Sequence, residues 1–362
     1  MARILLISTV KTETFIGDMA EKLSKDNEVW RYSILESKLT NYTSGQVVLF
    51  STKNSKISIV FSAFKLKSYL KEIDYIHYHF INVYSVLIHL LVFNFSKCIK
   101  YATFWGSDFS LAKKKGRLSY LFFKRMDKIL FSNGISLKDF SSLYPKLEDK
   151  LEIIKWPLSI LELQKNIKNT DKGVFDFNIP LGKQIVCVGT NGGKNQNHLR
   201  IIEELNKLNT KISDEFYFLF PAGYPKNNDI YIKEIESKLK VSSLSFYHID
   251  TSFHTEIDLA YYRNMTDILI QVQNNDMFSG AMQEAIFGGA KIITGSWLPY
   301  EILDVNNVML FKIDDFSQLS KTLIEAKNFE FSPEMKKHNA EVIYSLSGWE
   351  IIKKQWFGLY KS

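Results

Sequence analysis

The sequence is poor in the residues that mark disulfide-rich, fibrous or disordered chains. It has 2 cysteines, 7 prolines and 17 glycines among 362 residues. Cys98 and Cys187 both lie in apolar runs, which indicates buried thiols in a reducing compartment and excludes a disulfide framework. The low proline and glycine content excludes collagen-like and disordered classes. With 46% hydrophobic and 14% aromatic residues, the chain has enough apolar side chains to fill two cores.

A long apolar run and a secretory leader are also missing. Residues 80–95 (FINVYSVLIHLLVFNF) form the most apolar stretch, but it is short for a membrane span and contains Asn82, His89 and Asn94. A core helix is the better interpretation. Met1 to Arg3 lead directly into the apolar run ILLIS without a cleavage-like segment, so we expect a cytoplasmic protein.

The length fits two α/β domains. A chain of 42.1 kDa is long for one domain and suits two of about 150 to 180 residues. Short apolar runs alternate with helical spacing, which predicts parallel, doubly wound sheets. We expect strands at 3–8, 29–34, 47–50, 57–61, 75–80, 99–104, 128–132 and 151–156, then at 184–189, 216–222, 244–249, 267–272, 291–294 and 308–312. A helix is expected at 256–265. The predicted parts are a first domain (1–163), a linker (164–183), a second domain (184–345) and a C-terminal helix that returns to the first domain (346–362).

Basic residues concentrate in the first half. Residues 1–160 hold 24 Lys and Arg against 14 Asp and Glu, or +10, whereas residues 161–362 hold 22 against 25, or −3. The cluster Lys113, Lys114, Lys115 and Arg117, followed by Lys124, Arg125 and Lys128, is either a solvated face or a surface that attracts anionic lipid headgroups or a pyrophosphate-linked acceptor. The second interpretation predicts peripheral contact with the cytoplasmic face of the inner membrane. No nucleic-acid-binding motif is legible, so we expect no nucleic acid partner.

Residues 271–295 (QVQNNDMFSGAMQEAIFGGAKIITG) predict a strand, a loop, a helix and a strand. Ser279 is a good N-cap, so the first amides of the helix point at the loop, where the helix dipole favours an anion such as phosphate. Gly288 and Gly289 end the helix. Glu284 is a carboxylate on an otherwise apolar helix, either solvent-facing or placed to bind a ribose hydroxyl pair.

A second phosphate-cradling arrangement opens the second domain. The strand 184–189 leads into TNGGKNQNH (190–198) and then a helix. Gly192 and Gly193, beside Asn191, let the backbone approach a ligand, and Lys194 can offset charge on a departing diphosphate. The loop matches neither of the common phosphate-binding fingerprints, and an ordinary turn with a solvated lysine is the alternative.

Two strand ends of the first domain carry polar side chains. His77 and His79 share one face of a strand, and His79 falls near its carboxyl end. No Cys, Asp or Glu completes a metal site nearby, so from the residues alone a structural histidine is favoured over a metal ligand. In ATFWGSDF (102–109), Gly106 permits a turn, and Asp108 is either a helix cap or a catalytic carboxylate.

Read together, these motifs resemble those of GT-B glycosyltransferases, whose nucleotide-sugar signature is an acidic residue, seven residues and a Glu before a helix. Asp276 and Glu284 supply that pair here, although the first acid is usually Glu, and GSWLPYEIL (295–303) sits where the family returns to the donor. The segments VGTNGGKNQNH and PAGYPKNNDIYIKEIE, with FWGSDF, resemble the TDP-Fuc4NAc transferases of enterobacterial common antigen synthesis. The resemblance implies two Rossmann-like doubly wound domains facing across a cleft and a His79 that reaches the donor sugar. It also implies an Asp108 that acts as base on the acceptor hydroxyl or orients His79.

The expected function is therefore that of a glycosyltransferase of the hexosyltransferase type. The donor would be a nucleotide-diphosphate sugar, and the acceptor a cell-envelope polysaccharide or polyprenyl-pyrophosphate-linked oligosaccharide. No Asp-x-Asp motif occurs, so we expect no metal and no cofactor. Another GT-B enzyme, such as an epimerase or glycerophosphotransferase, or a non-catalytic nucleotide-sugar-binding protein, remains the alternative. The expected catalytic residues are His79, Asp108 and Lys194, and the expected substrate contacts are Asn191, Gly192, Gly193, Asp276, Met277, Phe278, Ser279, Gly280 and Glu284.

Overall fold

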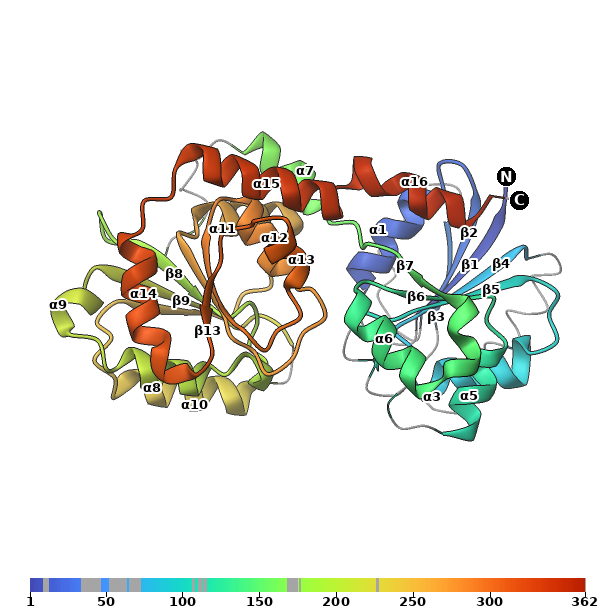
Figure 1. Ribbon diagram of the computed structural model, residues 1–362, viewed down its shortest axis with the longest axis horizontal. Helices are drawn as coiled ribbons and strands as arrows, with labels where there is room; N and C mark the ends of the chain where they lie inside the picture. Colours follow the sequence, from blue (N-terminus) through green and yellow to red (C-terminus); the bar gives the residue numbers. More distant parts are fainter. Residues whose placement is uncertain are drawn as a thin grey trace. The chain divides into compact units, whose positions relative to one another are not determined.

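The computed structural model folds into two compact α/β units (Figure 1). The first comprises Met1–Trp156 with Lys353–Ser362, and the second Pro157–Ile352. The structure describes residues 1–8, 13–33, 47–51, 64, 73–105, 108–109, 113, 116–167, 175, 177–225 and 228–361. The expected strand at 57–61, Gly106, Lys114 and Lys115 lie outside these residues, as does part of the expected linker.

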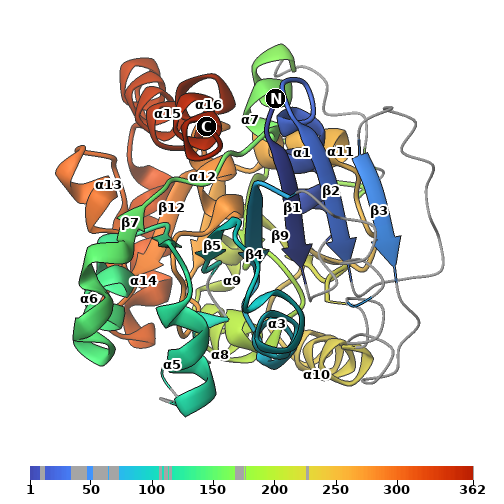
Figure 2. The same ribbon diagram turned by 90° about the vertical axis from the view of Figure 1, so that its right-hand side faces the viewer.

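The first unit is built on a seven-stranded parallel sheet in the order β3-β2-β1-β4-β5-β6-β7. Figure 2 shows β3, β2, β1 and β4 side by side in this order. The strands are β1 (Arg3–Ser8), β2 (Glu28–Ser33), β3 (Val47–Ser51), β4 (Tyr75–His79), β5 (Ile99–Thr103), β6 (Lys128–Phe131) and β7 (Leu151–Ile153). Strands β1 and β4 are buried almost completely, as expected for parallel strands covered on both faces.

Helices cover both faces of this sheet. In Figure 1, α3, α5 and α6 lie on one face, and α1 and α16 lie on the other. The bounds are α1 (Glu13–Leu23), α3 (Val83–Ile88) with its π-helical continuation η1 (His89–Phe93), α5 (Arg117–Lys124), α6 (Gly134–Leu143), the 3-10 turn η2 (Pro145–Lys150) and α16 (Trp349–Leu359).

The second unit repeats the plan with a six-stranded parallel sheet in the order β10-β9-β8-β11-β12-β13. Its strands are β8 (Gln184–Val188), β9 (Phe216–Pro221), β10 (Tyr247–Asp250), β11 (Ile268–Gln271), β12 (Lys291–Gly295) and β13 (Phe311–Ile313). Its helices are α7 (Ile160–Asn166), α8 (His198–Leu205), α9 (Thr210–Ser213), α10 (Asp229–Lys240), α11 (Glu256–Met265), α12 (Gly280–Phe287), α13 (Glu301–Val305), α14 (Leu319–Asn328) and α15 (Pro333–Ser347), with 3-10 turns η4 (Lys194–Gln196) and η5 (Phe316–Gln318).

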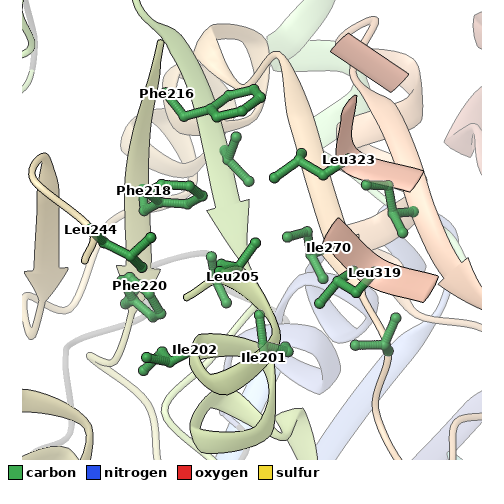
Figure 3. Packing of buried hydrophobic residues seen from close by; sticks show 14 of the residues in the cluster. Ile201, Ile202, Leu205, Phe216, Phe218, Phe220, Leu244, Ile270, Leu319 and Leu323 are labelled. Atoms are coloured by element: carbon green, nitrogen blue, oxygen red, sulfur yellow. The ribbon is translucent and has the colours of Figure 1, made fainter. Parts of the chain in front are cut away.

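One face of the second sheet carries a large apolar core (Figure 3). Alternate residues of β9 and β11 point into it, and helices α8 and α14 close it from outside. Its members include Phe216, Phe218, Ile270, Leu205 and Leu323, none more than 1% exposed. Burying each such side chain stabilises the fold by about 1.5–3 kcal/mol. The core therefore holds strands such as β9 and β11 in place, and with them the loops at their ends.

Most expected elements are present, and a few have different bounds. Arg3–Ser8 and Glu256–Met265 have the bounds predicted. The apolar stretch at 80–95 is a core helix, α3 with η1, and no helix of the described residues is long and apolar enough to cross a membrane. The strand expected at 244–249 is Tyr247–Asp250, because Leu244 is buried in the core without joining the ladder.

Candidate functional site

Each sheet reverses its strand order once, and such switch points are where open α/β sheets bind ligands. In the first unit the reversal lies between β1 and β4, where Ser8 pairs in register with His79. In the second it lies between β8 and β11, where Val188 pairs with Ile270. The loops that follow β8 and β11 contain most of the residues expected to bind the donor.

Hydrogen bonds join these two loops of the second unit. Gln196 Nε2 donates to Gln273 Oε1 at 2.6 Å, and Asn197 Nδ2 donates to the carbonyl of Val272 at 2.9 Å. The amide of Asn274 donates to the carbonyl of Asn195 at 3.1 Å. The loops that follow β8 and β11 therefore form one hydrogen-bonded structure at the switch point of the second sheet.

The glycine-rich loop after β8 is packed closely against its neighbours. A Cβ on Gly192 would lie 3.1 Å from the backbone of Ala222, so glycine is needed there for packing. The amide of Gly192 donates to the carbonyl of Tyr224 at 2.7 Å, and that of Gly193 donates to Asn191 Oδ1 at 2.9 Å. Both amides are thus engaged within the protein. The side chain of Lys194 is exposed, with Nζ 5.4 Å from the centroid of the Tyr231 ring.

Helix α12 begins as the sequence predicts. Ser279 is its N-cap, and Ser279 Oγ accepts from the amide of Met282 at 3.3 Å. The amides of Gly280 and Ala281 have no hydrogen-bond acceptor among the residues that the structure describes. First-turn amides cannot bond within the helix, so these two donors, at the positive end of the helix dipole, are available to an anion.

Asp276 is held inside the loop that precedes α12. Its Oδ2 accepts from the amide of Ser279 at 2.7 Å and from the hydroxyl of Tyr300. Burial raises the pKa of Asp276 above its ordinary value, although hydrogen bonds from Tyr300 and from backbone amides lower it in part. Met277 is buried beside it and Phe278 is half-buried, with its ring centroid 6.3 Å from that of Tyr300.

Glu284 lies one turn into α12 and forms a buried ion pair. Its Oε2 accepts from Arg263 Nε of α11 at 3.1 Å, and the side chains are 10% and 5% exposed. Burial lowers the pKa of Arg263, but the charge of Glu284, its hydrogen bond to Arg263 and the nearby Cys187 and Tyr262 together raise this pKa above its ordinary value. Glu284 Oε1 makes no hydrogen bond to the described residues, and a Cβ on Gly280 would lie 3.8 Å from it.

His79 is fully buried at the switch point of the first sheet. Its ring stacks on that of His77 at 4.1 Å, and the rings of Trp105 and Trp156 each lie 6.0 Å away. Neither ring nitrogen has a hydrogen-bond partner among the described residues. Burial, and then the positive charge of Arg31, lower the pKa of His79 to about 3, so the imidazole is neutral at neutral pH.

His77, by contrast, has both ring nitrogens engaged. Nδ1 lies 2.6 Å from the hydroxyl of Tyr360, and Nε2 lies 2.6 Å from Thr103 Oγ1. The ring of His77 is therefore fixed by Tyr360 and Thr103, and it stacks against the ring of His79.

Asp108 joins the loops that follow β4 and β5. Its Oδ1 accepts from the amide of Trp105 at 2.9 Å, and its Oδ2 accepts from the amide of Ile81 at 3.0 Å. No hydrogen bond from Asp108 reaches the ring of His79. Asp108 therefore positions the loops that follow β4 and β5.

The described residues contain no group of three His, Cys, Asp or Glu side chains placed to hold a metal ion. Two residues of the site were not expected from the sequence. Arg263 gave no local signal, because its partner Glu284 lies 21 residues away. Tyr300 lies in the 295–303 segment expected near the donor, but nothing in the sequence indicated that its hydroxyl would bind Asp276.

Comparisons with known proteins place this arrangement among solved structures. No protein-family model and no curated protein matches the sequence. The structure is similar to that of a glycosyltransferase from Rickettsia africae (13% identity, TM-score 0.75, 100% of this chain and 98% of that chain covered). It is also similar to sucrose-phosphate synthase from Thermosynechococcus elongatus (12%, 0.77, 99% and 98%) and to HepE from Anabaena in complex with UDP and glucose (10%, 0.74, 99% and 99%).

At these identities the likeness shows the fold. The expected fold class is confirmed: the chain has two Rossmann-like doubly wound α/β units and the fold of GT-B glycosyltransferases. The resemblance to the TDP-Fuc4NAc transferases and the roles of the individual site residues stay predictions.

Proposed function

We propose that the protein is a glycosyltransferase that moves a sugar from a nucleotide-diphosphate sugar to an acceptor hydroxyl without a metal ion. The observation that carries the proposal is the open end of α12 at the switch point of the second sheet. Two unpaired amides, those of Gly280 and Ala281, meet the positive end of a helix dipole there. A diphosphate is the part of such a donor that this end suits.

The donor would lie on the second unit. Its diphosphate would accept hydrogen bonds from the amides of Gly280 and Ala281, and Lys194 would offset the charge that develops as the diphosphate leaves. Glu284 Oε1 would accept from a ribose hydroxyl, while Arg263 holds Oε2 and so fixes the carboxylate. Asp276 is engaged by Ser279 and Tyr300, so its expected sugar contact would use its remaining lone pairs.

The acceptor would react at the first unit. The bond between the anomeric carbon and the diphosphate oxygen breaks, the acceptor oxygen bonds to that carbon, and the acceptor proton leaves to a base. His79 is neutral, and its unpaired nitrogens suit a hydrogen bond to a sugar hydroxyl better than they suit proton removal, because an imidazole of such low pKa is a weak base. Asp108 is the candidate base, positioned by the amides of Trp105 and Ile81.

We further propose a cell-envelope polysaccharide or lipid-linked oligosaccharide as the acceptor. The similar structures include sucrose-phosphate and trehalose-phosphate synthases, so this assignment does not come from them. It rests on the basic first half of the chain, which suits a pyrophosphate-linked acceptor.

A thermal-shift screen with UDP, TDP, GDP and CMP sugars tests the donor. A ligand that binds only the folded state raises Tm, by an amount set by its concentration relative to Kd. We expect one diphosphate sugar to raise Tm and CMP sugars, which hold a single phosphate, to leave it unchanged. Incubation with the selected donor and an acceptor then separates transfer, which releases free nucleoside diphosphate, from epimerisation or binding, which do not. No stabilisation by any diphosphate sugar would overturn the proposal.

A further inference from the structure

One face of the first unit exposes large apolar side chains on two neighbouring helices. Val83 and Leu91, on α3 and η1, are each 56% exposed, and Phe95 in the turn that follows is 85% exposed. On α5, Leu118 is 56% and Leu121 is 46% exposed. We call these five residues the apolar ridge. Single exposed apolar residues are ordinary on protein surfaces, but a group of this size on adjacent helices marks an interaction site.

The ridge is the outer side of a packed helix pair. Inside, His89 of η1 meets Phe122 of α5 with ring centroids 5.3 Å apart, and both side chains are fully buried. Val83 and Leu91 are exposed whereas His89, between them in sequence, is fully buried, so the two apolar side chains lie on the outer side of the helix pair. Figure 1 shows α3 and α5 side by side on the face of the sheet away from α1 and α16. The ridge therefore has no partner among the described elements of its own unit.

A basic hollow adjoins the ridge. It measures about 450 Å³, and its lining includes Lys97, Lys100, Lys124, Arg125, Lys150 and one acid, Asp127. Phe95 belongs to both the ridge and this lining. Lys100 and Lys150 are held by backbone carbonyls. Lys97, Lys124 and Arg125 form no ion pair with any carboxylate of the described chain. The hollow thus presents an excess of fixed positive charge.

We propose that the apolar ridge and the basic hollow together bind the surface of an anionic phospholipid membrane. Exposed Leu and Phe side chains beside unpaired Lys and Arg match a bilayer surface, where acyl chains lie just below anionic phosphates. Phe95, Leu91, Leu118 and Leu121 enter the boundary of the acyl region, and headgroup phosphates occupy the hollow. Charge complementarity selects lipid over a second copy of this surface, because two such faces would place their basic hollows against each other.

The apolar ridge begins, at Val83, near the carboxyl edge of the first sheet, where β4 ends. Helix α3 begins at Val83, shortly after His79 at the end of β4, and η1 continues it to Phe93, next to the turn that holds Phe95. A membrane that contacts the ridge would therefore run past the strand end where, on the proposed function, the acceptor reacts. Lipid binding itself does not require sugar transfer. An experiment can therefore show the lipid-binding proposal to be wrong while the proposed transfer stands, and the reverse.

Vesicle flotation tests the proposal with the full-length protein. Vesicles of phosphatidylglycerol and phosphatidylcholine (1:1) and of phosphatidylcholine alone are compared at 0.1 M salt. We expect binding to the anionic vesicles only. The Lys124→Glu/Arg125→Glu double variant should bind at least about tenfold more weakly, because each basic residue near an anionic surface contributes on the order of 1 kcal/mol. Phe95→Ser should also bind more weakly through lost apolar insertion.

Matched controls come from the second unit. Lys211→Glu/Lys240→Glu makes the same change in net charge at exposed lysines, and Val241→Ser removes an apolar side chain that is 82% exposed. Both should bind like the unmodified protein. Equal weakening by the controls would reduce the effect to bulk charge and overturn the proposal. An absence of binding to anionic vesicles would also overturn the proposal. So would self-association without lipid, measured by sedimentation, if Phe95→Ser abolished that self-association.

Discussion

Arg263 and Glu284 form a buried ion pair across two helices of the second unit, with Nε and Oε2 3.1 Å apart. The pair gives the candidate ribose carboxylate one fixed oxygen and leaves the other without a hydrogen bond to the described residues. A carboxylate held in this way keeps its position one turn into α12 while its other oxygen stays available. The pair therefore connects the stability of the second unit with the proposed donor site.

Removing both partners of this pair should cost less than the sum of the two single removals. Arg263→Met leaves Glu284 buried without its cation, and loss of one member of a buried pair costs about 3–5 kcal/mol. The double variant Arg263→Met/Glu284→Gln removes both charges, so its loss in unfolding free energy should be smaller than the sum of the two single losses. Urea unfolding of the three variants measures this coupling. Additive losses would contradict a direct pair.

The α12 end can be tested by removing one amide. Gly280→Pro deletes the N–H of the first helical residue, a position where proline is tolerated, and Ser279 before it already has an extended ψ of 120°. We expect nucleoside diphosphate affinity to fall about tenfold or more, because a hydrogen bond to a charged group contributes about 1.5–3 kcal/mol. Isothermal titration with the nucleotide selected by the thermal-shift screen measures the loss.

Gly280→Ala is the matched control for that variant. It adds the same Cβ, which would lie 3.1 Å from Leu158 Cδ2, but it keeps the N–H. Its affinity should stay close to that of the unmodified protein. If the alanine and proline variants lost affinity equally, steric crowding rather than the amide would explain the result, and the anion site at α12 would be wrong.

Lys194 should act in the reaction without a metal ion. Because its ammonium group would stabilise the departing diphosphate, Lys194→Ala should lower kcat by about 100-fold, the range observed when one charge-stabilising donor is removed. Lys211→Ala, at another exposed lysine, should leave kcat unchanged. The unmodified enzyme should keep its rate in EDTA. Reversible loss of turnover on chelation would instead assign leaving-group stabilisation to a metal.

The local elements of this fold were predictable, whereas the contacts that define the site were not. The apolar run Arg3–Ser8 and the capped helix Glu256–Met265 carry local signals, and their predicted bounds match. Ser279 was likewise found as an N-cap because capping depends on neighbours within three residues. The Arg263–Glu284 pair, by contrast, needs α11 and α12 to be packed together, and no local pattern encodes that packing.

The glycine-rich loop illustrates the same limit. Gly192 signalled a close backbone approach, and the structure contains one, but the approach is to Ala222 of the loop after β9. The sequence also placed His79 at a strand end. His79 stands at the switch point because β4 pairs with β1, and no local sequence pattern encodes this pairing between distant segments.

The buried, neutral His79 should make the first unit sensitive to acid. In the unfolded chain a histidine has a pKa near 6.5, but in the fold the pKa of His79 is lowered to about 3. Between these values the unfolded chain binds a proton that the folded chain does not, so stability falls as pH decreases from 6.5 toward 3. From pH 7.5 to 4.5, His79 alone should contribute a loss of about 2.5 kcal/mol in unfolding free energy.

His79→Leu should remove that part of the pH dependence, because leucine fills a buried site without a titrating group. Urea unfolding followed by tryptophan fluorescence is weighted toward the first unit, which holds four of the six tryptophans, with Trp105 and Trp156 beside the ring. His338→Leu, at an exposed histidine of the second unit, should leave the pH dependence unchanged. If His79→Leu lost sugar transfer but kept donor affinity and folded normally at pH 7.5, the unpaired imidazole would have a role in the reaction. Unchanged transfer would make His79 a residue of the core alone.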